Sequence, residues 1–196
     1  MSLKPGALVF QVLGKGGFVD AISISASRED ARLAAAPVSH VGIIAGFEEV
    51  VHVDEKDGVI IAPLGEFLAG AGLSVVAEVR DADVASRAAA AAYGYVGRPY
   101  NASFYPGGEG LYCSELVAKC FICQSGMPYF APCRMNFRDA GGRLIPYWIE
   151  YYAKLGCAIP EGMEGSHPQQ LLAQKHLFSS IRPIRRACPP VHGKTR

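Results

Sequence analysis

Short apolar runs separated by glycine-containing turns dominate the first part of the chain. Runs of this length, rich in β-branched residues and bounded by Gly, Pro or Asp, are typical of strands. They predict five strands, at residues 7–12, 38–45, 49–53, 58–62 and 73–79. Gly46-Phe47-Glu48 joins the second and third of these into a predicted hairpin, and Lys56-Asp57-Gly58 forms the turn to the fourth.

The hairpin contains two histidines on neighbouring strands. Successive side chains of a strand point to opposite faces, so Val51 and Val53 share one face while Val50 and His52 share the other. His40 lies within the preceding strand. We therefore expect the His40 and His52 imidazoles side by side on one face of the sheet.

Helical patterns occur both between these strands and after them. Helices are predicted at residues 27–36, 63–69, 84–95, 146–155 and 166–174, with a last strand at 176–184. Asp81 or Asp83 is suited to cap the alanine-rich third helix, and Gly97 to end it. Residues 185–196 are expected to form a solvated, flexible tail.

Cys113 lies where a flexible segment meets a helical one. Glycines precede the stretch Leu111-Tyr112-Cys113-Ser114-Glu115-Leu116-Val117, which predicts a helix with Cys113 on its first turn. The helix dipole and the free N–H groups at such a position lower a thiol pKa, in favourable cases to about 3.5–7.5. Cys113 is therefore a candidate nucleophile. The alternative is a buried structural cysteine, which is common.

Two loops suggest binding functions, with different strength. Gly14-Lys15-Gly16-Gly17 follows a strand, but the Gly-x-x-x-x-Gly-Lys-Ser/Thr pattern of a phosphate-binding loop is missing, so we interpret it as a plain loop. Residues 97–108 contain three aromatic residues and lead to Cys113. This loop either lines a cleft or uses its aromatic residues to pin a long connection to the core.

Composition limits the classes of function. The chain has 196 residues, a formal net charge of +1 and 50% hydrophobic residues, which suits one globular domain and argues against a disordered chain or a basic nucleic-acid binder. No apolar run is long enough for a transmembrane helix. Met1–Gly6 leads straight into a strand, so no signal peptide is expected.

The six cysteines show no regular framework and no complete zinc-finger spacing, including around Cys120, Cys123 and Cys133. They are expected to be reduced thiols, and we expect a cytoplasmic location.

A thiol hydrolase needs a cysteine at a helix start, a histidine that takes its proton, and a polar group that orients the histidine. Cys113, His40 and His52 suit these roles. His167, His176 and His192 are poorer candidates because they lie in the C-terminal region. A metal site of two histidines and Cys113 is a weaker alternative, so neither a metal nor another cofactor is expected.

Several segments together resemble a known family, the circularly permuted NlpC-type papain-like cysteine hydrolases of the YiiX/YebB-like branch. The histidine strand precedes the cysteine here, whereas the unpermuted enzymes have the reverse order. The matching segments are Pro5–Phe10, Ser39–Ile43, Val50–His52, Gly58–Val59, Pro63–Leu64, Gly97–Asn101, Tyr112–Val117 and Pro168–Leu171.

The resemblance implies a single α+β domain over residues 1–196, a small antiparallel half-barrel sheet packed on helices. It implies Cys113 as nucleophile and His40 as general base. Relatives carry His, Asn, Asp or Glu as the third residue, and His52 takes that place here, with Glu49 and Glu55 as alternatives. His40 and His52 are twelve residues apart, a spacing similar to that of the lecithin-retinol acyltransferase group.

The remaining site predictions concern the substrate. The backbone N–H of Cys113 and the Tyr112 hydroxyl are candidate donors to an oxyanion. Tyr112, Ser39, Tyr100 and Asn101 are predicted to contact a small peptide or acyl substrate.

Three functional hypotheses follow. The first is a cysteine hydrolase that cleaves an amide bond, in a cell-wall-type peptide by resemblance, through an acyl-thioenzyme. The second is a thiol acyltransferase or lipid deacylase with an apolar groove walled by Phe104, Tyr105 and residues 147–152. The third is a non-catalytic module that binds a small ligand.

Overall fold

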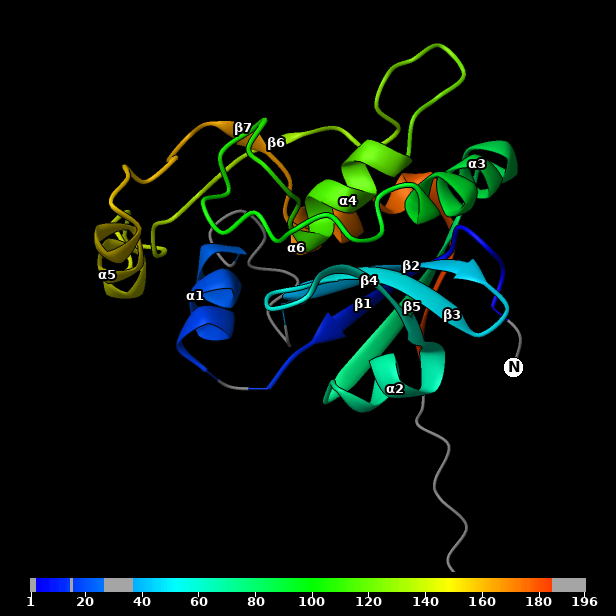
Figure 1. Ribbon diagram of the computed structural model, residues 1–196, viewed down its shortest axis with the longest axis horizontal. Helices are drawn as coiled ribbons and strands as arrows, with labels where there is room; N and C mark the ends of the chain where they lie inside the picture. The colour runs from blue at the N-terminus through cyan, green and yellow to red at the C-terminus, as the bar shows by residue number, and fades with distance from the viewer. Residues whose placement is uncertain (1–2, 15, 27–36, 185–196) are drawn as a thin grey trace, which may run out of the picture.

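The residues that the structure describes form a six-stranded main sheet and six α-helices (Figure 1). The structure is a computed structural model that describes residues 3–14, 16–26 and 37–184. The helix predicted at 27–36 and the predicted tail at 185–196 lie outside the described residues. None of the described helices is long and apolar enough to cross a membrane.

The strands agree closely with the predicted ones, except for two very short strands that the sequence analysis did not predict. They are β1 (Leu8–Val12), β2 (His40–Gly46), β3 (Glu49–Asp54), β4 (Gly58–Pro63), β5 (Leu73–Val79), β6 (Cys133–Arg134), β7 (Glu164–Gly165) and β8 (Phe178–Ile184).

The helices agree less uniformly, because the first was not predicted. They are α1 (Gly17–Ala26), α2 (Leu64–Ala69), α3 (Ala82–Tyr93), α4 (Cys113–Cys120), α5 (Pro146–Leu155) and α6 (Pro168–Ala173), followed by a 3-10 turn at Lys175–Leu177. The Asp81 side chain caps α3 by accepting hydrogen bonds from the N–H groups of Asp83 and Val84. The helix ends at Gly94 rather than at Gly97.

The main sheet has the strand order β4-β3-β2-β1-β5-β8, and every neighbouring pair is antiparallel. The sheet stays open. The predicted α+β class with an antiparallel sheet packed on helices is therefore confirmed. The β2–β3 hairpin pairs Gly42 with His52, which fixes the register of the two histidine strands.

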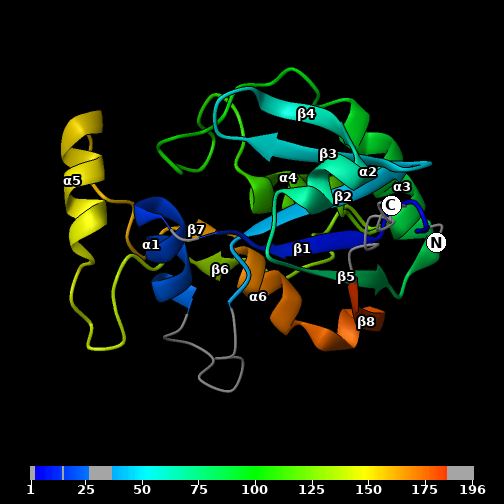
Figure 2. The same cartoon turned by 90° about the horizontal axis from the view of Figure 1, so that it is seen from below.

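Helices cover both faces of this sheet (Figures 1 and 2). Helices α3 and α4 pack on one face, where Val41, Val51 and Val53 join the larger apolar cluster. Helix α2 covers the other face, where Phe67 packs with Val9 and Val50. Val51 and Val53 thus lie on the face opposite to Val50, as the alternation predicts. The two strands that carry His40 and His52 are held between two apolar layers.

Helices α1 and α5 lie to one side of the sheet and share a third apolar cluster (Figure 2). Trp148 of α5 forms its centre, with ring contacts to Phe18, Phe104 and Phe137. The sequence analysis missed α1 because residues 17–26 begin with glycine and include β-branched residues, which favour strands and loops. Tertiary packing of Phe18, Ala21 and Ile22 against α5 and its neighbours outweighs those preferences.

A short parallel bridge sets the position of α4. Tyr100 pairs with Leu111: the Leu111 N–H donates to Pro99 O at 3.0 Å, and the Asn101 N–H donates to Leu111 O at 3.1 Å. Gly110 precedes this bridge with φ +94°, and a Cβ at this position would lie 2.2 Å from Pro99 O. The approach of the two segments therefore requires glycine at residue 110.

We predict that Gly110→Ala destabilises the protein more than Gly107→Ala does. Both glycines have positive φ, but a Cβ on Gly107 would meet no atom within 4 Å. Gly107→Ala should cost about 1–2 kcal/mol for the left-handed backbone alone, whereas Gly110→Ala must also separate the bridge. Urea unfolding of the two variants tests this, and equal losses would show that the bridge tolerates displacement.

Candidate active site

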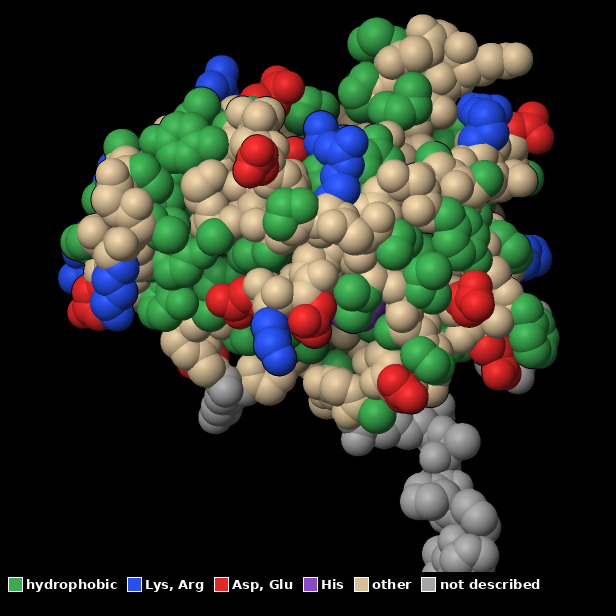
Figure 3. Space-filling model, in the orientation of Figure 1, with side chains coloured by type: hydrophobic (Ala, Val, Ile, Leu, Met, Phe, Trp, Pro, Cys, Tyr) green, Lys and Arg blue, Asp and Glu red, His purple; other side chains and the backbone are tan. Residues whose placement is uncertain are grey.

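A cavity of about 520 Å³ contains the residues that the sequence analysis singled out. Cys113, His40 and His52 all line it. One part of the wall comes from β1, β4 and α2, and another comes from α1, α5 and the loops between the elements. In Figure 3 a small histidine surface is visible in a hollow of the molecule. The volume is within the range usual for small-molecule sites.

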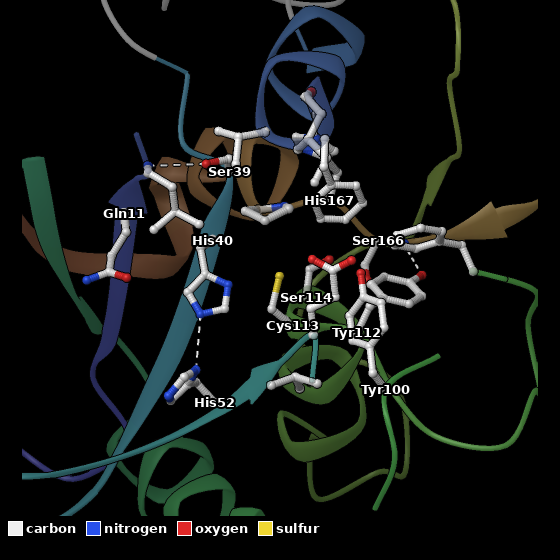
Figure 4. A pocket seen from close by; sticks show the side chains of 18 of the residues that line it. Gln11, Ser39, His40, His52, Tyr100, Tyr112, Cys113, Ser114, Ser166 and His167 are labelled. Atoms are coloured by element: carbon white, nitrogen blue, oxygen red, sulfur yellow. Dashed lines mark hydrogen bonds between the residues drawn. The ribbon is translucent and has the colours of Figure 1, made fainter. Parts of the chain in front are cut away.

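His40 and His52 form the predicted pair. His40 Nε2 lies 3.2 Å from His52 Nδ1, and the two rings are nearly perpendicular (Figure 4). The Phe67 ring packs against both imidazoles, with its centroid 4.8 Å from that of His52. Gly42 leaves room for this arrangement, because a Cβ there would lie 2.9 Å from Phe67 Cζ and 3.3 Å from His52 Cβ. The pair is therefore held by packing as well as by its hydrogen bond.

Cys113 is the first residue of α4, as predicted. Its sulfur receives backbone hydrogen bonds from Val41, Ser114 and Cys113 itself. Val41 follows His40 in β2, so the sulfur lies against the strand that carries the imidazole. In Figure 4 the sulfur faces the side of the His40 ring that carries Nδ1, while Nε2 faces His52. This leaves Nδ1 as the nitrogen able to exchange a proton with the thiol.

The protonation states of Cys113 and His40 differ from those expected for a cysteine at the start of a helix. Burial raises the pKa of the Cys113 thiol to about 11, although the three backbone hydrogen bonds oppose the rise. Burial also lowers the pKa of His40 to about 3, aided by the neighbouring His52 and opposed by Asp54. The predicted lowering of the Cys113 pKa is therefore wrong, because desolvation outweighs the helix terminus. At neutral pH the resting pair is a thiol and a neutral imidazole.

Asp54 is a neighbour of both histidines that the sequence analysis missed. Burial lowers the pKa of His52, and the Asp54 charge together with the Val53 backbone opposes that fall. Burial disfavours ionisation of Asp54, but hydrogen bonds from the N–H groups of Asp57 and Lys56 and the charges of the histidines hold its carboxyl pKa below the ordinary value. The strand alternation was the signal available, since residues 52 and 54 share a face.

Three of the four predicted substrate contacts line the cavity: Ser39, Tyr100 and Tyr112. Asn101 does not belong to the wall. Its side chain is buried, donates to Tyr105 O at 3.0 Å and accepts from the Ser103 hydroxyl at 2.8 Å. It therefore stabilises the loop that leads to α4.

The two tyrosines differ in how their hydroxyls are used. The Tyr112 hydroxyl accepts a hydrogen bond from Ser166 N–H at 3.3 Å, and burial raises its pKa to about 12. Burial, followed by the nearby Cys113, raises the pKa of Tyr100 well above its ordinary value. Both phenols therefore remain protonated at neutral pH and can donate to a developing oxyanion. Figure 4 places both tyrosines on the other side of Cys113 from His40.

His167 lies closer to the site than its sequence position suggested, because it lines the cavity. Its Nδ1 accepts from the Gln169 N–H at 3.0 Å as the cap of α6, and its Nε2 lies 3.3 Å from Ile22 O in α1. Burial lowers its pKa to about 4. Both ring nitrogens are thus engaged, so His167 joins two walls of the cavity. His176 is exposed in the 3-10 turn, and His192 lies outside the described residues.

Two serines, Ser114 and Ser166, also line the cavity, and their Oγ atoms are buried. Ser114 follows the nucleophile directly in α4, and Ser166 lies beside Tyr112. Both Oγ atoms are enclosed by protein, so these serines form part of the cavity wall without offering a hydroxyl to its open space.

Across the residues that the structure describes, no group of three or more His, Cys, Asp or Glu side chains could hold a metal ion. The site instead offers a thiol, two imidazoles and phenolic and backbone donors around one cavity.

Comparisons with known proteins extend over nearly the whole chain. A family model described as permuted papain-like amidase enzyme, YaeF/YiiX, C92 family, matches residues 2–179. No curated protein matches the chain. The crystal structure of metalloprotein yiiX from Escherichia coli O157:H7 is similar, with a TM-score of 0.66 and 20% identity over 95% of this chain and 98% of that chain. At this identity the likeness shows a shared fold.

We predict that Cys113 reacts slowly with iodoacetamide at neutral pH. Because its pKa is raised to about 11, the reactive thiolate forms only as the pH rises, and the alkylation rate should still increase above about pH 9. Peptide mass spectrometry measures the rate, with the exposed Cys157 as internal reference and Cys113→Ser to assign the signal. A rate that reaches its plateau below pH 7 would show a resting thiolate–imidazolium pair instead.

Proposed function

The chain belongs to the permuted papain-like amidase family, YaeF/YiiX, C92, and on this premise we propose that it is a cysteine amidase that acts through Cys113. The observation that carries the proposal is the placement of the Cys113 sulfur against β2, on the Nδ1 side of a His40 ring whose Nε2 faces His52. Cys113 is the nucleophile, His40 the general base and acid, and His52 the group that orients His40.

The reaction begins from the neutral pair. As the sulfur attacks the amide carbonyl carbon, the thiol proton moves to His40 Nδ1. His40 then carries its second hydrogen on Nε2 and donates it to His52 Nδ1. The carbonyl oxygen takes up negative charge, and the Cys113 N–H together with the Tyr100 or Tyr112 hydroxyl donates to it.

Collapse of this intermediate breaks the carbon–nitrogen bond. His40 returns the proton to the departing amine, and a thioester remains on Cys113. A water molecule then attacks the thioester carbonyl and gives a proton to His40. Release of the carboxylic acid restores the thiol, and this proton returns to the sulfur.

The substrate is proposed to be a peptide amide. The resemblance to NlpC-type enzymes makes a bacterial cell-wall stem peptide, or a fragment of one taken up into the cytoplasm, the first substrate to test. Ser39, Tyr100 and Tyr112 are proposed to contact it, since they line the cavity.

We predict that Cys113→Ala and His40→Ala each lower kcat by about a thousandfold or more, and that His52→Ala lowers it by about ten- to a hundredfold. Losses at residues that act together should not add, so the double variant of His40 and His52 should be no slower than His40→Ala. Release of amines from a panel of peptide amides measures these rates. His176→Ala, an exposed histidine outside the cavity, is the control. Full activity of Cys113→Ala would refute the proposal.

The apolar wall of the cavity supports a second candidate function, acyl transfer or lipid deacylation. Phe18, Val19 and Ile22 of α1 line it, as do Phe104 and Trp148. Of the groove proposed from the sequence, Phe104 and Trp148 lie in the wall. Tyr105 lies outside it, and its hydroxyl donates to Ala158 O at 3.0 Å. An aromatic and aliphatic wall favours an apolar acyl group.

We predict that Val19→Asn lowers kcat/KM for substrates with a long apolar acyl group more than for their acetyl analogues, if this wall holds the acyl chain. Val19 lines the cavity, and one missing apolar contact is worth about tenfold or more. The exposed neighbour Asp20→Asn is the control. Product analysis with an added acceptor amine separates transfer from hydrolysis. Equal losses for both substrate classes would count against this function.

A further inference from the structure

Asp54 carries a negative charge next to the two histidines, at the end of β3. The register pairs Gly42 with His52. Because the strands are antiparallel, counting two residues back along β2 and two residues forward along β3 sets residue 54 across from residue 40. Side chains directly opposite have Cβ atoms about 4.5–5.5 Å apart. His40, His52 and Asp54 therefore share one face of the hairpin, and all three line the cavity.

The turn after β3 fixes the direction of this carboxylate. Asp54 Oδ1 accepts two backbone hydrogen bonds, from Lys56 N–H at 2.8 Å and from Asp57 N–H at 3.0 Å. Both bonds use the same oxygen, so the turn holds the side chain while leaving Oδ2 outside its hydrogen bonds. The carboxylate is ionised at neutral pH, since its pKa lies below the ordinary value.

Proton transfer creates a charge that the site must stabilise. When Cys113 loses its proton, the pair of His40 and His52 gains one positive charge. Burial makes this charge unfavourable, as the lowered pKa values of both imidazoles show. His52 offers a hydrogen-bond acceptor but no negative charge. A fixed carboxylate nearby therefore stabilises the imidazolium without moving during the reaction.

We propose that Asp54 is a positioning residue of the active site, whose fixed charge stabilises the protonated His40–His52 pair while the Cys113 sulfur attacks. This inference rests on the proposed function and adds a fourth residue to it. Asp54 acts through the imidazoles and across a gap, since its hydrogen bonds in the described chain go to the turn. During the attack the site thus holds a negative sulfur, a positive pair of imidazoles and a negative carboxylate.

Other charged or titratable groups also line the same cavity. Glu55 follows Asp54 in the turn and is exposed, and Glu66 lies on α2 beside Phe67. On β6, Arg134 donates to Gly162 O, and His167 is held between Ile22 and Gln169. The Asp54 charge opposes the burial that lowers the pKa of both His40 and His52.

The test is Asp54→Asn. The asparagine carbonyl can accept the same two backbone hydrogen bonds, so the turn is kept and only the charge is removed. We expect kcat for peptide-amide hydrolysis to fall by about tenfold, the effect of one nearby charge at a partly exposed site, with a small change in KM. The acid limb of the pH–rate profile should move to lower pH, because the imidazoles become harder to protonate.

Asp57→Asn is the matched control, since it removes a charge from the same turn at an exposed residue that does not line the cavity. Imidazole NMR titration gives a readout that needs no substrate: the pKa of His52 should fall in Asp54→Asn and stay unchanged in Asp57→Asn. Asp54→Glu should recover part of kcat by restoring the charge.

The outcomes separate this inference from the function on which it rests. If Cys113→Ala is inactive while Asp54→Asn keeps the wild-type rate, acid limb and imidazole titration, Asp54 has no such role and the amidase remains. If kcat falls in Asp54→Asn without a shift of the acid limb or of the His52 pKa, the residue is merely structural and the inference is wrong. If Cys113→Ala is fully active, the proposed function itself fails.

Discussion

The hydrogen bond between His40 Nε2 and His52 Nδ1 is the contact on which the site depends. It fixes which nitrogen of His40 remains for the thiol, and it requires β2 and β3 to pair in one register, because a slip by one residue would turn His52 to the opposite face of the sheet. Phe67 and Gly42 keep the rings in place. The apolar packing of α2 thus helps to hold the two imidazoles in position, although α2 supplies no reacting group.

Burial gives this pair an unusual resting state. A helix start lowers a thiol pKa through a partial charge, but removing the thiolate from water costs more here, so Cys113 stays protonated. A thiolate and an imidazolium then form only during the proposed reaction and are not present beforehand. In the proposed mechanism, the groups that favour this charge separation are the N–H of Val41 and the carboxylate of Asp54, which act on opposite charges at the two ends of the proton transfer.

The sequence was most informative where the alternation of a strand or the start of a helix decided the structure. Alternation in the β2–β3 hairpin predicted the histidine pair, and the change from glycines to a helical pattern predicted Cys113 at the start of α4. The sign of the Cys113 pKa was wrong because burial depends on what packs over the helix, which the local sequence does not show. Helix α1 was missed for a similar reason, since its stability comes from α5, far along the chain.

Asn101 and His167 show that closeness to Cys113 in the sequence does not decide whether a residue reaches the cavity. Asn101 lies close to Cys113 in sequence but supports a loop, while His167 lies far away and reaches the cavity wall through the cap of α6. Distance along the chain is a poor guide because Cys113 and His40 come from different elements, α4 and β2, that lie against each other. The proposed chemistry requires that the first turn of α4 lies against the strand carrying His40, and either order of the two segments along the chain satisfies that requirement. A permuted connection therefore changes the loops that join the elements and leaves the proposed proton path from Cys113 to His40 and His52 intact.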